Sequence, residues 1–321
     1  MDSHLILCSH NGERFIKEQI TSILDQEEEI KFLHIFDFAS SDQTLEILAD
    51  LQAQHPQRRW NITRVDHAPG AAASFFHAIQ KTAPLVQPRD CVFLADQDDV
   101  WLKNKTSVIK SIFLKEIKSA PKDRLLIFHD VAITDEKLCI TQESFYTGNP
   151  YSVPRDLACD RLILCNPIIG HTMTLSGALL QLAAENLHGP NYLMHDWAIG
   201  LLASRTSRIC YANTPALSLY RQHDNNVLGA SRKRSLLSKI RRTHSFAQKI
   251  IIQAKEFSLL LTKVEKEINH PNKLDNWLIK ITQKRNLSWA IYPTLGFMAF
   301  ARGPTIQRKL LSAFIFLRWI I

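Results

Sequence analysis

The first 130 residues alternate short apolar runs with segments whose apolar residues recur at helical spacing. Five apolar runs predict buried strands, at 4–8, 31–36, 61–65, 91–95 and 125–130. The intervening segments predict helices, at 13–24, 44–54, 71–81 and 102–118. This alternation predicts an α/β fold with a mostly parallel, doubly wound sheet. Ligands of such sheets bind beyond the carboxyl ends of the strands, so the polar residues that follow each strand are the candidates for chemistry.

The pattern changes at about Ser231, where apolar and basic residues interleave at helical spacing. We therefore expect one α/β domain over 1–230 and a helical, basic and apolar extension over 231–321. Two apolar segments, 287–301 and 310–321, are shorter than the roughly 20 residues that span a bilayer. They fit helices that lie in a membrane interface, or helices that pack back on the first domain, and the two interpretations are compatible.

Charge is distributed unevenly between these two parts. Residues 231–321 hold 18 basic and 4 acidic residues, whereas 1–230 hold 21 basic and 27 acidic residues. A strongly cationic tail predicts contact with an anionic surface, either a membrane or a nucleic acid. The apolar content of the tail favours the membrane, so we expect an anionic membrane surface and no nucleic acid among its partners.

Other features of the sequence narrow the class of protein. The six cysteines form no CxxC pair, which favours reduced thiols over a disulfide framework or a zinc site. The N-terminal residues lack the basic and long apolar regions of a secretory signal, so we expect a cytoplasmic protein, peripheral at the inner face of the cell membrane. The glycine-rich motifs of dinucleotide-binding and P-loop proteins are absent.

An acidic cluster directly follows the apolar run 91–95. Asp96, Asp98 and Asp99 place three carboxylates in four residues, and such a cluster is stable mainly where a hard cation neutralises it. A Mg²⁺ or Mn²⁺ there would offset the charge of a departing nucleotide diphosphate. An EF-hand is a poor alternative, since Trp101 and Ser107 stand where its glycine and its bidentate acid are needed. A solvated acidic turn that caps a helix stays open as the structural alternative.

Six segments in this order resemble the motifs of family-2-type glycosyltransferases of the GT-A fold, and within them the bacterial rhamnosyltransferase-like group. The resemblance covers roughly residues 4–230 and is carried by 8–20, 37–44, the segment from Gly70, 96–101, 195–197 and 220–226. It implies a GT-A type fold and transfer of a sugar from a nucleotide donor, with inversion, using Mg²⁺ or Mn²⁺. Rhamnose is the first candidate sugar, and a saccharide or lipid-linked saccharide of a bacterial surface polysaccharide is the expected acceptor.

The resemblance also implies roles for particular residues. The donor-binding candidates are Ser9, Asn11, Asp37, Gly70, Asp96 and Arg221, and the metal-ligand candidates are Asp96, Asp98, Asp99 and His223. Asp196 is the candidate general base, because an inverting transfer needs one carboxylate to take the proton of the attacking hydroxyl. Each candidate has a structural alternative: Asp196 as a helix N-cap, Arg221 as the partner of an acidic residue, and His223 as a solvated histidine. His129 and His171 lack metal-ligand spacing and receive no role.

Four positions depart from the family pattern at the nucleotide end of the expected pocket. They are His10, Phe38, Ala39 and Ser74, where the family usually has tyrosine, an acid, glycine and asparagine. Two further hypotheses therefore stay open. One is the same fold acting on a UDP- or GDP-linked sugar. The other is a degenerate, non-catalytic binding protein that keeps the fold.

Overall fold

The computed structural model describes residues 1–147, 153, 157, 162–163, 165–188, 192–224, 251–269 and 275–276. Its centre is a seven-stranded sheet in the order β10-β6-β9-β4-β1-β2-β3. The strands are β1 (Ser3–Ser9), β2 (Phe32–Phe38), β3 (Arg59–Val65), β4 (Cys91–Ala95), β6 (Leu125–His129), β9 (Thr174–Ser176) and β10 (Arg208–Ala212). All neighbours pair in parallel except β9, which runs antiparallel to both β4 and β6. The prediction of a mostly parallel sheet is confirmed.

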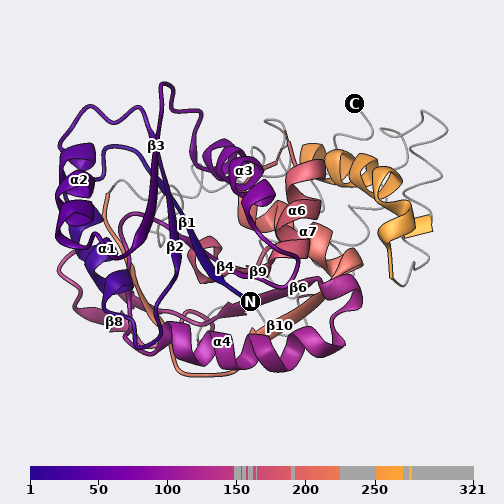
Figure 1. Cartoon of the computed structure of the whole chain (residues 1–321). Coiled ribbons are helices and arrows are strands. Elements are labelled where there is room, and N and C mark those ends of the chain that lie inside the picture. The colour runs from indigo at the N-terminus through magenta and orange to yellow at the C-terminus, as the bar shows by residue number, and fades with distance from the viewer. Residues whose placement is uncertain are drawn as a thin grey trace, which may run out of the picture.

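Helices cover both faces of this sheet (Figure 1). One layer holds α1 (Ile16–Leu24), α2 (Thr44–Gln54) and α4 (Lys105–Glu116), and the other holds α3 (Ala71–Thr82), α6 (Gly177–Asn186) and α7 (His195–Thr206). Strand β4 shows why both faces are apolar: Val92 and Leu94 enter one core, and Phe93 and Ala95 enter the other. The sheet is therefore doubly wound, as the alternating pattern predicts.

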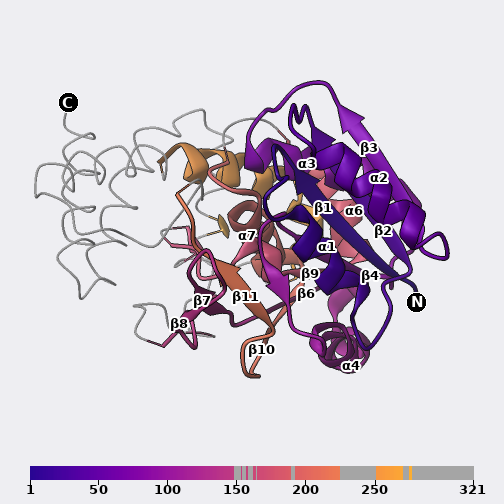
Figure 2. The same ribbon diagram turned by 90° about the vertical axis from the view of Figure 1, so that its left-hand side faces the viewer.

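A smaller four-stranded sheet, in the order β5-β11-β7-β8, begins directly after the acidic cluster. Its strands are β5 (Val100–Trp101), β7 (Ala132–Thr134), β8 (Ile140–Gln142) and β11 (Ser218–Arg221). Figure 2 shows β7, β8 and β11 at the other end of the molecule from α2 and β3. Because β11 pairs with β5, β11 lies close to the loop that follows β4.

One part of the C-terminal extension is described, a helix over 251–263 that lies beside α6 and α7 (Figure 1). Its buried residues join the core cluster of α3, α6 and α7, and Phe257 is fully buried there. Ion pairs also join the extension to the α/β domain: Glu267 pairs with Lys122 and Arg124, and Asp275 pairs with Arg205. This stretch thus packs on the α/β domain, one of the two arrangements expected for the extension.

The described residues contain no helix long and apolar enough to cross a membrane. The expected domain boundary at 230 and the apolar segments 287–301 and 310–321 lie outside the described residues. The division into 1–230 and 231–321 and the membrane contact of the tail therefore stay predictions.

Candidate active site

The acidic cluster lies at the carboxyl end of β4, where a doubly wound sheet binds its ligands. Asp99 is fully buried and Asp96 is partly exposed. The Nδ1 atom of His171 lies 2.8 Å from Oδ2 of Asp99 and 3.5 Å from Oδ2 of Asp96. The acids are therefore held together around an imidazole, and the alternative of a simple solvated turn does not describe this geometry.

His171 reaches the cluster because β9 is antiparallel. The 3₁₀ turn Gly170–Thr172 precedes β9, and the start of an antiparallel strand lies beside the end of its neighbour. Leu94 of β4 donates its N–H to the carbonyl of Met173 at 3.0 Å, which fixes the turn at this place. The sequence gives no sign of this arrangement, because His171 has no ligand spacing to Asp96 or Asp99.

Asp96, Asp99 and His171 fit a divalent cation. One ligand atom from each lies within 4.8 Å of the others. Two carboxylates and an imidazole are a donor set suited to Mn²⁺. Among the described residues, Oδ2 of Asp99 and both ring nitrogens of His171 are buried without a well-formed hydrogen bond. Burial lowers the pKa of His171, but the nearby carboxylates of Asp99 and Asp96 outweigh burial and raise the pKa to about 9, so a proton and a cation compete for this site.

A buried lysine lies beneath this cluster. Nζ of Lys105 donates to the carbonyl of His171 at 3.0 Å and lies 3.6 Å from the centre of the Trp101 ring. Burial lowers the pKa of Lys105 well below its usual range, opposed by the charges of Asp99 and Asp96. Lys105 therefore fixes the backbone of the turn that carries His171.

The predicted ligands Asp98 and His223 lie together, since Nε2 of His223 is 2.9 Å from Oδ2 of Asp98. The His223 ring packs on Phe15 with ring centres 4.9 Å apart. The structure thus brings Asp96 and Asp99 to His171, and Asp98 to His223. The set of Asp96, Asp98, Asp99 and His223 as metal ligands stays a prediction.

Arg221 is almost fully buried, and its nitrogens contact the protein. Its Nε donates to the carbonyl of Asp98 at 2.8 Å, and its Nη2 donates to Glu18 at 2.5 Å. The guanidinium also lies 4.6 Å from the centre of the Phe15 ring. These contacts match the structural alternative, in which Arg221 pairs with an acidic residue. Its role in donor binding stays a prediction.

The donor candidates of β1 and β2 form one hydrogen-bonded network. Asp37 is fully buried and accepts from the hydroxyls of Ser9, at 3.0 Å, and Ser40, at 2.5 Å. Asn11 is exposed, has a left-handed φ of 48°, and accepts from the N–H of Ser41 at 2.9 Å. In this structure Asp37 joins the loops that follow β1 and β2, and Asn11 is exposed.

Gly70 is the N-cap of α3 and has φ 94° and ψ 160°, a conformation close to glycine-only. A Cβ atom at this position meets no atom within 4 Å, so the backbone here borders open space. Of the departures from the family pattern, Phe38 is buried and packs edge-on against His77 at 5.8 Å, and Ser74 is also buried. Ala39 has a left-handed φ of 54°, which explains why glycine suits that position.

Asp196 is the second residue of α7, whose N-cap is Met194, so the N-cap interpretation of Asp196 is wrong. Its Oδ1 accepts from the N–H of Trp197 at 2.5 Å, and the carboxylate also accepts from the N–H of Gly170. Burial raises the pKa of Asp196 from its ordinary 3.8 to about 7, and the charge of Asp96 adds to this shift. A carboxyl that titrates near neutral pH is suited to general base catalysis.

The neighbours of Asp196 belong to the core. His195 is buried and stacks on Phe75 with ring centres 3.8 Å apart. Trp197 is buried, and its indole N–H donates to the carbonyl of Leu162. Neither side chain offers an open wall for an acceptor; both instead hold the start of α7.

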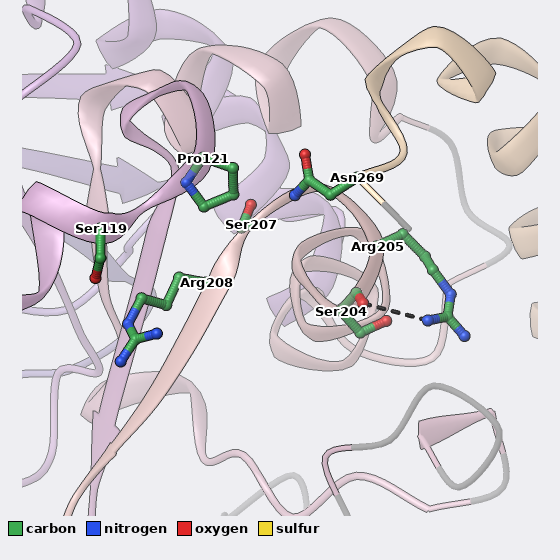
Figure 3. Close-up of a pocket in the computed structure, with 7 residues that line it drawn as sticks. All are labelled: Ser119, Pro121, Ser204, Arg205, Ser207, Arg208 and Asn269. Atoms are coloured by element: carbon green, nitrogen blue, oxygen red, sulfur yellow. Dashed lines mark hydrogen bonds between the residues drawn. The ribbon is translucent and has the colours of Figure 1, made fainter. Parts of the chain in front are cut away.

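A separate cavity lies at the amino end of β10, away from the acidic cluster (Figure 3). Its guanidinium groups already have carboxylate partners, Asp275 for Arg205 and Glu116 for Arg208. The lining residues are Ser119, Pro121, Ser204, Arg205, Ser207, Arg208 and Asn269. None of the predicted site residues lines it.

Residues 4–116 match the family model described as Glycosyl transferase family 2. This part of the chain is similar to the family 2 glycosyltransferase domain. The resemblance seen in the motifs is confirmed, and the chain is a glycosyltransferase. The chain is also 23% identical over 235 residues to "dTDP-rhamnosyl transferase RfbG" of Shigella flexneri, an alignment covering 70% of this chain and 74% of that protein.

Solved structures agree on the fold. TarS residues 1–349 of S. aureus, in complex with UDP, matches with a TM-score of 0.52 at 14% identity, covering 100% of this chain and 88% of that one. GalNAc-T7 with UDP, GalNAc and Mn²⁺ matches with a TM-score of 0.53 at 10% identity, covering 95% of this chain and 58% of that one. The expected GT-A type fold is confirmed.

Proposed function

We propose that the chain transfers a sugar, with rhamnose as the first candidate, from a dTDP-linked donor to a saccharide or lipid-linked saccharide acceptor, with inversion. The observation that carries the proposal is one turn, Gly170–Thr172, that touches both an acidic cation site and a carboxyl with a pKa of about 7. The similarity to a dTDP-rhamnosyl transferase supports the choice of donor.

The chemistry assigned to the chain's own residues is simple. Asp196, in its ionised form, takes the proton of the acceptor hydroxyl while that oxygen bonds to the anomeric carbon. The bond from that carbon to the diphosphate breaks on the opposite face, and the nucleoside diphosphate leaves. A cation held by Asp96, Asp99 and His171, or by the predicted set with Asp98 and His223, would supply positive charge to the leaving diphosphate.

At the nucleotide end, Gly70 and Asn11 are the candidates for direct contact with the donor, since both border accessible space. Asp37 and Ser9 support this end from beneath. Arg221 supports the cation loop through its bond to the carbonyl of Asp98.

A panel of dTDP, UDP, GDP and CDP, each with and without Mn²⁺, tests the donor by thermal shift, because a ligand that binds the native state raises its stability. We expect dTDP to give the largest shift, and only with Mn²⁺. A larger shift with UDP or GDP would assign that nucleotide instead. Asp196→Asn is expected to keep the shift and lose transfer, and full turnover in this variant would refute the base assignment.

A second candidate function is a non-catalytic binding protein. The burial of Asp37 and Phe38 favours it, because neither side chain presents a free polar group to a nucleobase. The retained acids and Asp196 argue against it. No shift with any nucleotide in the panel would move the proposal to this candidate.

We also propose that the protein works at the cytoplasmic face of the cell membrane, with its cationic tail on anionic lipid. The exposed Ile252 and Leu259 of helix 251–263 add apolar surface on the described part of the tail. Deletion of 287–321 should release the protein in flotation with anionic vesicles, and a truncated protein that still floats would refute the anchoring. An RNA shift assay is the matched test for a nucleic acid.

A further inference from the structure

We propose that the Gly170–Thr172 turn positions Asp196, and that His171 anchors this turn on the acidic cluster. The inference rests on the proposed function, because it concerns how the candidate base of that site is held. Two adjacent residues make contacts in the two halves of the site, Gly170 with Asp196 and His171 with the acidic cluster.

On the base side, Gly170 touches Asp196 through its backbone. Its N–H is hydrogen-bonded to the Asp196 carboxylate. A Cβ at Gly170 would lie 2.7 Å from Nε2 of His195 and 3.6 Å from Oδ2 of Asp196. The His195 ring cannot move aside easily, because it is buried and stacks on Phe75 at 3.8 Å. The absence of a side chain at Gly170 therefore lets the turn approach the base.

On the cluster side, His171 is held by contacts from separate parts of the fold. Its Nδ1 lies 2.8 Å from Asp99, its carbonyl accepts from Lys105 at 3.0 Å, and its ring lies 5.0 Å from the ring of Tyr220 on β11. His171 is fully buried. Because His171 is anchored by its ring and its backbone, the preceding residue, Gly170, has little freedom to move.

The two sides are linked through the Cα atom of Gly170, which joins the Ile169–Gly170 peptide to the Gly170–His171 peptide. A displacement of His171 moves this Cα atom, and with it the N–H of Gly170 that is hydrogen-bonded to the Asp196 carboxylate. Misplacement of a catalytic group by about 1 Å can cost on the order of a hundredfold in rate. His171 thus acts on the base as a positioning residue, in addition to being a candidate cation ligand.

Four variants test this link. His171→Leu removes the polar anchor, and His171→Asn keeps a nitrogen donor near the position of Nδ1. Gly170→Ala leaves all charges unchanged and crowds His195. Thr174→Val is the matched control, a buried residue of β9 whose hydroxyl has no hydrogen-bond partner among the described residues.

The main measurement is made without cation or donor, in chelator, so that any role as a metal ligand does not enter. Unfolding free energy is measured against pH for each variant with Asp196 and with Asp196→Asn, and the difference between the two curves reports the titration of Asp196. We expect a midpoint near pH 7 in wild type and Thr174→Val, and a higher midpoint in both His171 variants, because both lose a charge that lowers the pKa of Asp196. We expect Gly170→Ala to raise the midpoint above wild type, and His171→Leu to raise it above His171→Asn, each by at least about half a pH unit, through loss of a hydrogen bond to the ionised form.

Equal midpoints in His171→Leu and His171→Asn would overturn the inference, because the two variants share the loss of the His171 charge and differ only in the polar anchor. If Gly170→Ala does not fold, the two His171 variants still decide. With a transfer assay in hand, Gly170→Ala should lower kcat at least tenfold and leave the Mn²⁺-dependent shift with dTDP unchanged. If no nucleotide raises the Tm of wild type, the proposed function fails. The pH dependence of unfolding still tests whether the Gly170–Thr172 turn positions Asp196.

Discussion

Asp196→Asn should stop transfer and yet stabilise the protein at alkaline pH. Burial holds the pKa of Asp196 near 7 in the native state, against 3.8 without that environment. A group whose native pKa is raised contributes stability that is fully present below the unfolded pKa and is lost as pH rises through the native pKa. Wild type therefore loses this contribution between about pH 4 and pH 8, whereas asparagine does not titrate.

The magnitude follows from the two pKa values. Between pH 5 and pH 8, a native pKa of about 7 and an unfolded pKa of 3.8 give a loss of about 2.6 kcal/mol. Asp196 is partly exposed, so screening by water reduces the expected loss to about 1–2 kcal/mol. At about 2–4 °C per kcal/mol, the Tm of the variant should gain about 2–8 °C on wild type over this interval.

The assay is urea unfolding of both proteins at pH 5, 6, 7 and 8 in chelator. The quantity of interest is how the difference in unfolding free energy between the two proteins changes with pH. The amide itself has the same effect at every pH, so it does not contribute to this change. Two curves that stay parallel from pH 5 to pH 8 would refute the reasoning, because Asp196 would then be ionised in the native state throughout. Mn²⁺ bound at the acidic cluster should lower the midpoint, since the charge of Asp96 contributes to the raised pKa.

Three further predictions concern other parts of the molecule. Ala39→Gly should stabilise the protein by about 1 kcal/mol in urea unfolding, because it relieves a left-handed φ of 54°, and an unchanged midpoint would contradict this strain. Phe257→Ala should cost about 3–5 kcal/mol in a single unfolding transition, since the side chain is fully buried in the main core; a separate early transition would show that helix 251–263 unfolds alone. Asp98→Asn should abolish the Mn²⁺-dependent thermal shift with dTDP, whereas Asp66→Asn, at a side chain that is 96% exposed, should leave it intact.

Strands and helices could be predicted from the sequence where their apolar residues form a continuous run or a clear period. Strand β4 was expected at 91–95 and is found at Cys91–Ala95, and α2 was expected at 44–54 and is found at Thr44–Gln54. The strand is a continuous apolar run, and the helix is long enough for its period to appear in the sequence. In contrast, β9 has three residues and no visible period, so neither its insertion between β4 and β6 nor its direction could be expected.

The site was predictable where its residues are adjacent in sequence. Short motifs single out the acidic cluster and Asp196, and the structure places both beside the Gly170–Thr172 turn. His171 was dismissed, because its partners come from a distant segment that only the sheet topology brings close. The contacts of Arg221 were likewise hidden, since pairing of β11 with β5 delivers it to Asp98.

The antiparallel strand β9 also decides when this enzyme becomes competent during folding. The sheet without β9 consists of two separate parallel groups, β3-β2-β1-β4 and β6-β10, because β9 alone joins β4 to β6. The central sheet is therefore continuous only after β9 has paired with both β4 and β6. The turn at its amino end then arrives with it, and a chain emerging from the ribosome has neither the cation site nor a fixed base until its central sheet is complete. Amide hydrogen exchange at Leu94, whose N–H bonds to Met173, would follow that closure directly.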